Sequence, residues 1–219
     1  MLKRIPEPDL MDSDEQAQAY ASADFSDANK IFLSNMLSVS SSLHGKAILD
    51  VGCGDGEIII DIKKRFDCNL TAIDGSASML KQFLLKSVKN NIQDVSVINE
   101  RIEKHPFKNN SFDYVICNSL LHHVKNPQLF WERVIDITKP GGYVFAMDLV
   151  RPHNLMSLNN ILQKHGNDNQ VLMKDFKNSL MAAYTVNEVE KQISIFKGIK
   201  SIINIVSDRH FFVTIHVEK

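Results

Sequence analysis

A glycine-rich turn follows the first strongly apolar segment of the chain. Gly52, Gly54 and Gly56 alternate with other residues in the sequence DVGCGDGE at 50–57. Glycines permit positive φ and let a ligand lie against bare backbone, and the helix that follows directs its N-terminal amides at that ligand. A phosphate loop needs a Gly-Lys-Ser/Thr that is absent, and Glu57 stands where a dinucleotide fingerprint has its third glycine. The turn therefore favours a ligand with a carboxylate and a cation, although a plain strand-to-helix turn is the simpler alternative.

Asp74 ends the next apolar segment, in the sequence TAIDGS. An acidic side chain about 20 residues after the first glycine can accept two hydrogen bonds from a ribose diol. The alternative role is an exposed carboxylate that caps the next helix. Together, the glycine turn and Asp74 indicate an adenosine-containing ligand without a diphosphate.

Short apolar segments alternate with helical patterns along the chain. Such alternation predicts a parallel sheet covered on both faces, whose ligands lie beyond the carboxyl ends of the strands. The expected strands cover residues 47–51, 70–73, 95–98, 114–117 and 143–147, with a late hairpin over 201–206 and 210–217; the expected helices cover 24–39, 57–65, 78–89 and 127–137. A turn is expected at 139–142, from the sequence KPGG.

Four motifs in order resemble the class I S-adenosylmethionine-dependent methyltransferases of the small-molecule type. They are ILDVGCGDGE at 48–57, TAIDGSASML at 71–80, PFKNNSFDYVICNSLLHHV at 106–124 and KPGGYVFAMDL at 139–149. The resemblance implies an α/β fold: a doubly wound, mainly parallel seven-stranded sheet with an antiparallel C-terminal hairpin strand and helices on both faces. It also implies S-adenosylmethionine as cofactor and S-adenosylhomocysteine as product.

The resemblance assigns most of the expected cofactor contacts. Asp50 would act on the methionine ammonium, and Asp74 would bind the ribose hydroxyls. Further contacts with the methionine and adenine portions would come from Gly52, Cys53, Gly54, Gly75, Met79, Asn118 and His123.

The expected adenine contact departs from the family pattern. Relatives often place an Asp about six residues before the Pro106-Phe107 pair, and here that position falls near Arg101. An arginine has no hydrogen-bond acceptor. The adenine amine is then expected to meet Glu100, Glu103 or the backbone around Ile102.

Methyl transfer from a sulfonium asks mainly for positioning and desolvation of the acceptor. A general base is needed only if the acceptor must lose a proton. His122 and His123 are the candidate catalytic residues, because the resemblance implies that they follow the fourth strand on the loop that borders the methyl group; a packed or solvated loop histidine is the alternative. Tyr20, Asp148 and Arg151 are candidate substrate contacts, and no metal is expected because no further ligands stand out near Asp148.

A single domain is expected over residues 1–219, since one domain commonly takes 100–200 residues or somewhat more. Within it, we expect an N-terminal helical lid (1–45), a cofactor-binding core (46–149), a helical insertion that caps the acceptor (150–184), and a C-terminal helix and strands (185–219).

The charge balance argues against a nucleic-acid partner. With 25 basic and 26 acidic residues the chain is nearly neutral, whereas a duplex-binding module normally carries a basic face. No segment has the ~18 apolar residues of a membrane span, no signal peptide is recognisable, and three scattered cysteines fit a reducing cytoplasm.

The expected function is methyl transfer from S-adenosylmethionine to a small molecule by in-line displacement. Three alternatives stay open: a tRNA-modifying methyltransferase, a non-catalytic S-adenosylmethionine-binding protein, and a dinucleotide-dependent oxidoreductase. The sequence does not identify the acceptor atom.

Overall fold

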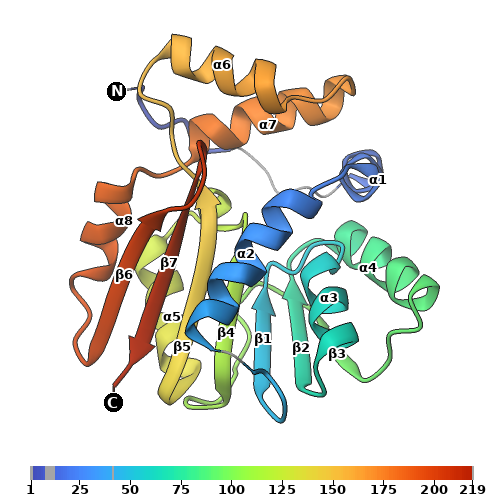
Figure 1. Cartoon of the computed structure of the whole chain (residues 1–219), viewed down its shortest axis with the longest axis vertical. Helices are drawn as coiled ribbons and strands as arrows, with labels where there is room; N and C mark the ends of the chain where they lie inside the picture. Colours follow the sequence, from blue (N-terminus) through green and yellow to red (C-terminus); the bar gives the residue numbers. More distant parts are fainter. Residues whose placement is uncertain (1, 8–12, 41, 219) are drawn as a thin grey trace.

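The computed structural model describes residues 2–7, 13–40 and 42–218. Seven strands form one sheet in the order β3-β2-β1-β4-β5-β7-β6 (Figure 1). They are β1 (Ala47–Val51), β2 (Asn69–Asp74), β3 (Val95–Asn99), β4 (Phe112–Asn118), β5 (Thr138–Leu149), β6 (Ile199–Ile205) and β7 (His210–Val217). All neighbours pair in parallel except β7, which is antiparallel to both β5 and β6. The predicted fold class and the late hairpin are confirmed.

Helices cover both faces of this sheet. They are α1 (Asp14–Ser22), α2 (Ser26–Val39), α3 (Glu57–Arg65), α4 (Ala77–Lys89), α5 (Pro127–Ile137), α6 (Leu155–His165), α7 (Gln170–Ala182) and α8 (Val186–Ile193), with a short 3₁₀ turn η1 (Leu121–His123). One core cluster joins α2, α3 and α4 to one face, with Phe32, Ile59 and Phe83 fully enclosed. The other joins α5 and α8 to the opposite face around Trp131.

The strand order places the ligand-binding edge. β1 lies between β2 and β4, so the chain leaves β1 in one direction and later returns on its other side. A switch of this kind opens a crevice at the carboxyl ends of the two strands. In Figure 1 this edge lies at the top, where α1, α6, α7 and the N-terminal segment gather above the sheet.

Two elements differ from the sequence predictions. Helix α1 was not predicted, because it buries only Ala17 and so shows little apolar periodicity; its start is fixed by Ser13, whose Oγ accepts a hydrogen bond from the Gln16 amide. The turn expected at 139–142 is wrong as a strand boundary. β5 already begins at Thr138, and a register shift opposite Phe112–Tyr114 accommodates these residues within the strand.

In the part of the chain that the structure describes, no helix is long and apolar enough to cross a membrane. The residues 150–184 expected as a helical insertion contain α6 and α7.

Candidate active site

The glycine turn between β1 and α3 adopts the left-handed backbone that its sequence predicted. Gly52, Gly54 and Gly56 have φ values of 69°, 56° and 79°, a region that costs an L-residue about 1–2 kcal/mol. A Cβ at Gly54 would lie 3.2 Å from Met79 Cε. Gly52 and Gly54 line a cavity with bare backbone, whereas the missing Cβ of Gly56 faces the ring of Phe83.

Asp74 organises this turn from the end of β2. Its carboxylate accepts hydrogen bonds from the backbone amides of Gly54 (2.9 Å) and Ser76 (2.7 Å). Asp74 also lines the cavity beside the glycine turn. This one carboxylate therefore fixes the loop geometry and can also accept hydrogen bonds from a ligand's hydroxyl groups.

Asp50 is a buried carboxyl group at the base of the same cavity. Burial, with the nearby Asp74 carboxylate, raises the pKa of Asp50 to about 8. A cationic ligand group beside it would favour the ionised form. This is the electrostatic environment that a methionine ammonium requires.

Asp50→Asn is expected to stabilise the cofactor-free protein at high pH. The folded state takes up a proton at Asp50 between the unfolded pKa of 3.8 and the folded pKa of about 8, so stability falls as pH rises across that window. Asparagine does not ionise, so the variant does not lose stability in this way. The difference in unfolding free energy between Asp50→Asn and the wild type should grow with pH to about 1–3 kcal/mol, the usual cost of an uncompensated buried polar group.

Urea unfolding at about pH 5 and about pH 8.5 measures this difference through its pH dependence. The matched control is Asp61→Asn, the same substitution at an exposed aspartate of α3. An Asp50→Asn advantage that is the same at both pH values would contradict the prediction.

A chain of side chains fixes the orientation of Asn118 at the end of β4. Glu57 Oε2 accepts from Asn29 Nδ2 (2.7 Å), and Asn29 Oδ1 accepts from Asn118 Nδ2 (3.3 Å). Because a carboxylate only accepts hydrogen bonds, this order leaves Asn118 Oδ1 pointing away. That oxygen is buried and has no hydrogen-bond partner among the described residues. A ligand with N–H or O–H groups would satisfy it, which fits the ammonium of S-adenosylmethionine.

Glu57 has a structural reason to stand where a dinucleotide site has glycine. Its Oε1 lies 2.7 Å from Lys86 Nζ, which also pairs with Asp55. The carboxylate is therefore compensated by Lys86 and used to orient Asn29.

A second and larger cavity of about 570 Å³ adjoins the first at the end of β4. The residues that line both cavities are Tyr20, Phe25, Asn29, Asn118, Ser119 and His123. Its remaining walls come from the N-terminal segment, α1, α7 and the residues around His210. The volume lies in the range of small-molecule sites, about 300–1,000 Å³.

His122 and Asp148 form a buried pair beside this larger cavity. His122 Nδ1 lies 2.6 Å from Asp148 Oδ1, and the carboxylate also accepts from the backbone amides of His122 and Leu149. Burial opposes a charge on the imidazole, but the Asp148 carboxylate outweighs it, so the pKa of His122 is raised. Nδ1 carries the proton that the carboxylate accepts, which leaves Nε2 for other partners.

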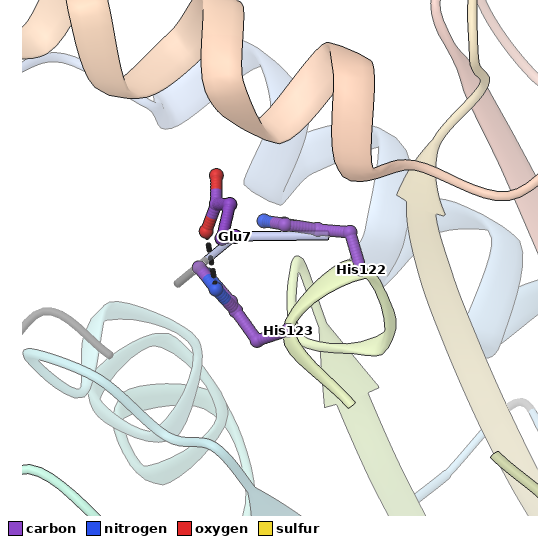
Figure 2. A group of neighbouring side chains, drawn as sticks. All are labelled: Glu7, His122 and His123. Carbon is purple, nitrogen blue, oxygen red and sulfur yellow. Dashed lines mark ion pairs between the residues drawn. The ribbon is translucent and has the colours of Figure 1, made fainter. Parts of the chain in front are cut away.

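His123 meets an acidic residue from the far N-terminus. Its Nδ1 lies 2.6 Å from Glu7 Oε2, and Figure 2 shows the two histidine side chains of η1 converging on Glu7. The other carboxylate oxygen, Glu7 Oε1, accepts from Ser179 Oγ of α7 at 2.8 Å. Glu7 thereby joins η1 and α7 across the cavity.

The structure brings most of the predicted site residues together. The cavity at the glycine turn is lined by Tyr20, Asp50, Gly52, Cys53, Gly54, Asp74, Met79, Asn118 and His123. Five others line neither cavity: Gly75, Arg101, Ile102, Asp148 and Arg151.

Their surroundings explain these placements. Arg101 is exposed and Ile102 is packed in the core, Asp148 lies behind His122, and Arg151 is buried against the Ala183 carbonyl and Glu188. The proposed contacts of Asp148 and Arg151 with an acceptor are thus not direct contacts in this structure.

Glu7, Asn29 and Ser119 are lining residues that the sequence analysis did not single out. Glu7 lies in a segment without periodicity, and Asn29 lies on an amphipathic helix whose apolar residues carry the signal. Ser119 follows Asn118 with a φ of 55°, a strained conformation that no residue type announces. Only the position of Ser119 directly after a predicted strand could have drawn attention to it.

Residues 49–146 match the family model described as a methyltransferase domain. These are the residues that carry the glycine turn, Asp74 and Asn118. They form a class I S-adenosylmethionine-dependent methyltransferase domain. S-adenosylmethionine is the cofactor of such domains, and the bare glycine backbone and the unpaired Asn118 Oδ1 fit it.

Curated relatives of the methyltransferase domain are similar over a 124-residue stretch. The ubiquinone biosynthesis O-methyltransferase of Klebsiella pneumoniae subsp. pneumoniae is 35% identical there, which covers 56% of this chain and 50% of that protein. The enzyme of the same name from Escherichia coli O157:H7 is 34% identical, covering 56% and 51%. The chain thus matches about half the length of these relatives.

Solved structures share the fold over nearly the whole chain. A S-adenosylmethionine-dependent methyltransferase from Aquifex aeolicus superposes with a TM-score of 0.68 at 19% identity, covering 94% of this chain and 98% of that one. The plantazolicin methyltransferase BamL, solved with a triazolic desmethylPZN analogue and S-adenosylhomocysteine, gives a TM-score of 0.74 at 18% identity, covering 94% of this chain and 91% of that one. These likenesses support the fold, including the parts outside the methyltransferase domain.

Proposed function

We propose that the protein transfers a methyl group from S-adenosylmethionine to a hydroxyl oxygen of a small polar molecule bound in the 570 Å³ cavity. The observation that carries this proposal is the junction of the two cavities at Asn118 and His123, which line both. An acceptor in the larger cavity would meet the methionine end of the cofactor there. Oxygen is favoured as the acceptor atom because the curated relatives are named O-methyltransferases.

The lining of the larger cavity favours a polar acceptor. Polar and charged side chains outnumber apolar ones, and its few large apolar residues are Phe25, Leu149, Leu172 and Phe176. Its charged side chains have both signs: the basic ones are Lys174 and Arg209, and the acidic ones are Glu7, Asp24, Asp27 and Asp175. A molecule with several hydrogen-bonding groups would be recognised better than a purely hydrocarbon one.

The protein's part in the reaction is to hold, orient and deprotonate. When bound, S-adenosylmethionine supplies a methyl group on a positively charged sulfur. Asp50, Asp74 and Asn118 would hold the cofactor through its ammonium and ribose groups. Tyr20, stacked on Phe25 at 4.4 Å, would exclude water at the junction. His122 and His123 line the larger cavity, and the acceptor hydroxyl would lose its proton beside them.

The proposed surroundings of the enzyme are those of a cytoplasmic small-molecule methyltransferase. Its three cysteines are buried and unpaired, which fits a reducing compartment. A large basic surface for nucleic acid is not expected from the near-neutral charge.

Calorimetric titration with S-adenosylmethionine, S-adenosylhomocysteine and NAD tests the cofactor, and incubation of small hydroxyl compounds with methyl-labelled S-adenosylmethionine tests transfer. We expect binding of the first two ligands, no binding of NAD, and label in an oxygen-linked methyl group. NAD binding alone would support an oxidoreductase, and label in tRNA instead would overturn the small-molecule acceptor. S-adenosylmethionine binding without transfer to any acceptor class would indicate a non-catalytic binder.

A further inference from the structure

We propose that Glu7, His122 and His123 bind one divalent transition-metal ion at the edge of the acceptor cavity. The ligand atoms of these three residues lie within 4.8 Å of one another. Two histidines and one carboxylate are a ligand set suited to Zn²⁺ and to other divalent transition metals. The inference rests on the proposed function, because it assigns a role to the same histidines. It departs from the sequence expectation of no metal, since Glu7 lies far from the histidines in the chain.

Two of the three groups are oriented by a partner behind them. Asp148 holds His122 through Nδ1 at 2.6 Å, and Ser179 holds Glu7 through Oε1 at 2.8 Å. Metal-ligating histidines and carboxylates characteristically have such outer hydrogen bonds, which fix the ring tautomer and the direction of the free atom. His122 Nε2 is the ring nitrogen left over, Glu7 Oε2 is turned toward His123 Nδ1, and Figure 2 shows the three side chains directed to the same space.

The third group, His123, has an unsatisfied nitrogen in that space. Nδ1 is buried and close to Glu7 Oε2, at 2.6 Å, but it makes no hydrogen bond of acceptable geometry among the described residues. The two histidine rings lie with their centroids 4.1 Å apart. A cation between the three atoms would satisfy Nδ1 and compensate the Glu7 carboxylate together.

The N-terminal segment is anchored so that Glu7 reaches this position. Arg4 donates to the carbonyl oxygens of Ala182 (2.6 Å) and His122 (3.0 Å) and stacks 4.0 Å from the Tyr184 ring centroid. The Ile5 amide donates to the Met181 carbonyl at 3.0 Å. Glu7 is therefore part of a fixed wall rather than a chance contact of a loose end.

The three ligands leave the cation open toward the cavity, which all of them line. A catalytic metal site typically has three protein ligands and keeps a position for substrate. A bound divalent metal lowers the pKa of a hydroxyl that coordinates it. The cation would thus hold the acceptor oxygen as its anion beside the junction of the two cavities, with the proton released to solvent. The acceptor class that this predicts is a chelating hydroxyl compound, with a second oxygen next to the hydroxyl.

The test is metal binding by the full chain without any acceptor. After chelator treatment, titration with Zn²⁺, and separately with Co²⁺ for its visible absorption, should show one tightly bound ion per chain. Glu7→Gln and His123→Asn should each weaken Zn²⁺ binding by at least tenfold and alter the Co²⁺ spectrum. Asp148→Asn should weaken it about 10–100-fold although Asp148 is not a ligand, as outer-shell substitutions do.

His165→Asn is the matched control. His165 lines the same cavity and contacts Asp208 at 2.8 Å, but it is not one of the three ligands, so this variant should bind Zn²⁺ as the wild type does. If a histidine variant fails to fold, Glu7→Gln still tests the metal site, because Glu7 lies outside the core and its substitution should leave the fold intact. Absence of a stoichiometric ion, or Zn²⁺ affinity unchanged in Glu7→Gln, would overturn the metal site.

These measurements separate the metal site from the proposed function. Stoichiometric Zn²⁺ binding without methyl transfer to any hydroxyl compound would retain the site and reject the function. Methyl transfer that persists in the presence of a chelator, by a protein that binds no ion, would retain the function and reject the metal site.

Discussion

Gly56→Ala is expected to destabilise the protein by about 2–5 kcal/mol, from left-handed strain of about 1–2 kcal/mol and overpacking of about 1–3 kcal/mol. Gly56 precedes α3 with a φ of 79°, and a Cβ there would overlap the ring of Phe83. Phe83 is fully enclosed in the core under α4, so the ring cannot swing away without opening a cavity. Urea unfolding measures the loss.

Two comparisons separate strain from overlap. Gly45 has a φ of 71° with nothing near its missing Cβ, so Gly45→Ala should cost only the strain, about 1–2 kcal/mol. In the double variant Gly56→Ala/Phe83→Leu, the smaller side chain relieves the overlap, and the total loss should be less than the sum of the single losses. Equal losses for Gly56→Ala and Gly45→Ala would show that Phe83 does not restrict the turn.

Asp74→Ala is expected to weaken S-adenosylmethionine binding by about 1.5–3 kcal/mol, or about tenfold or more. The substitution removes the proposed acceptor for the ribose hydroxyls. It also releases the Gly54 and Ser76 amides, which the carboxylate holds at 2.9 Å and 2.7 Å. The turn would then have to be ordered by the ligand itself. Calorimetric titration gives the change in affinity directly.

Asp61→Ala serves as the control for Asp74→Ala, because Asp61 is an exposed aspartate on α3. It should leave the affinity unchanged. Comparison with adenosine, which has the ribose but lacks the methionine, locates the effect: Asp74→Ala should weaken both ligands, whereas Asp50→Asn should weaken only S-adenosylmethionine. An Asp74→Ala protein that binds S-adenosylmethionine like the wild type would refute the ribose contact.

The central part of the fold could be predicted because its residues carry local signals. The glycines of the turn specify a backbone conformation, and the apolar strands with their intervening helices specify a parallel sheet. The C-terminal helix expected within 185–219 corresponds to α8, which starts at a capping box where both reciprocal hydrogen bonds of Thr185 and Glu188 form. In each case the decisive interaction lies within a few residues along the chain.

The acceptor side of the site could not be predicted for the opposite reason. Glu7 reaches His123 only because Arg4 and Ile5 bind backbone groups at the end of α7, and no local pattern in the first residues signals this docking. Asp148 was a candidate because it stands at the end of a strand. Its side chain contacts His122 instead of lining the cavity, and this depends on how β5 and η1 pack. Long-range packing of this kind has no periodic signature.

The docking of the N-terminal segment also orders events during synthesis. Arg4 and Ile5 are synthesised well before their partners Met181 and Ala182. Contacts of such large sequence separation form late, because the intervening chain must be closed into a loop. The cofactor-binding half can assemble while translation continues, and the wall that carries Glu7 closes only afterwards. A nascent chain halted before α7 would therefore lack the wall that α7 and Glu7 give the larger cavity.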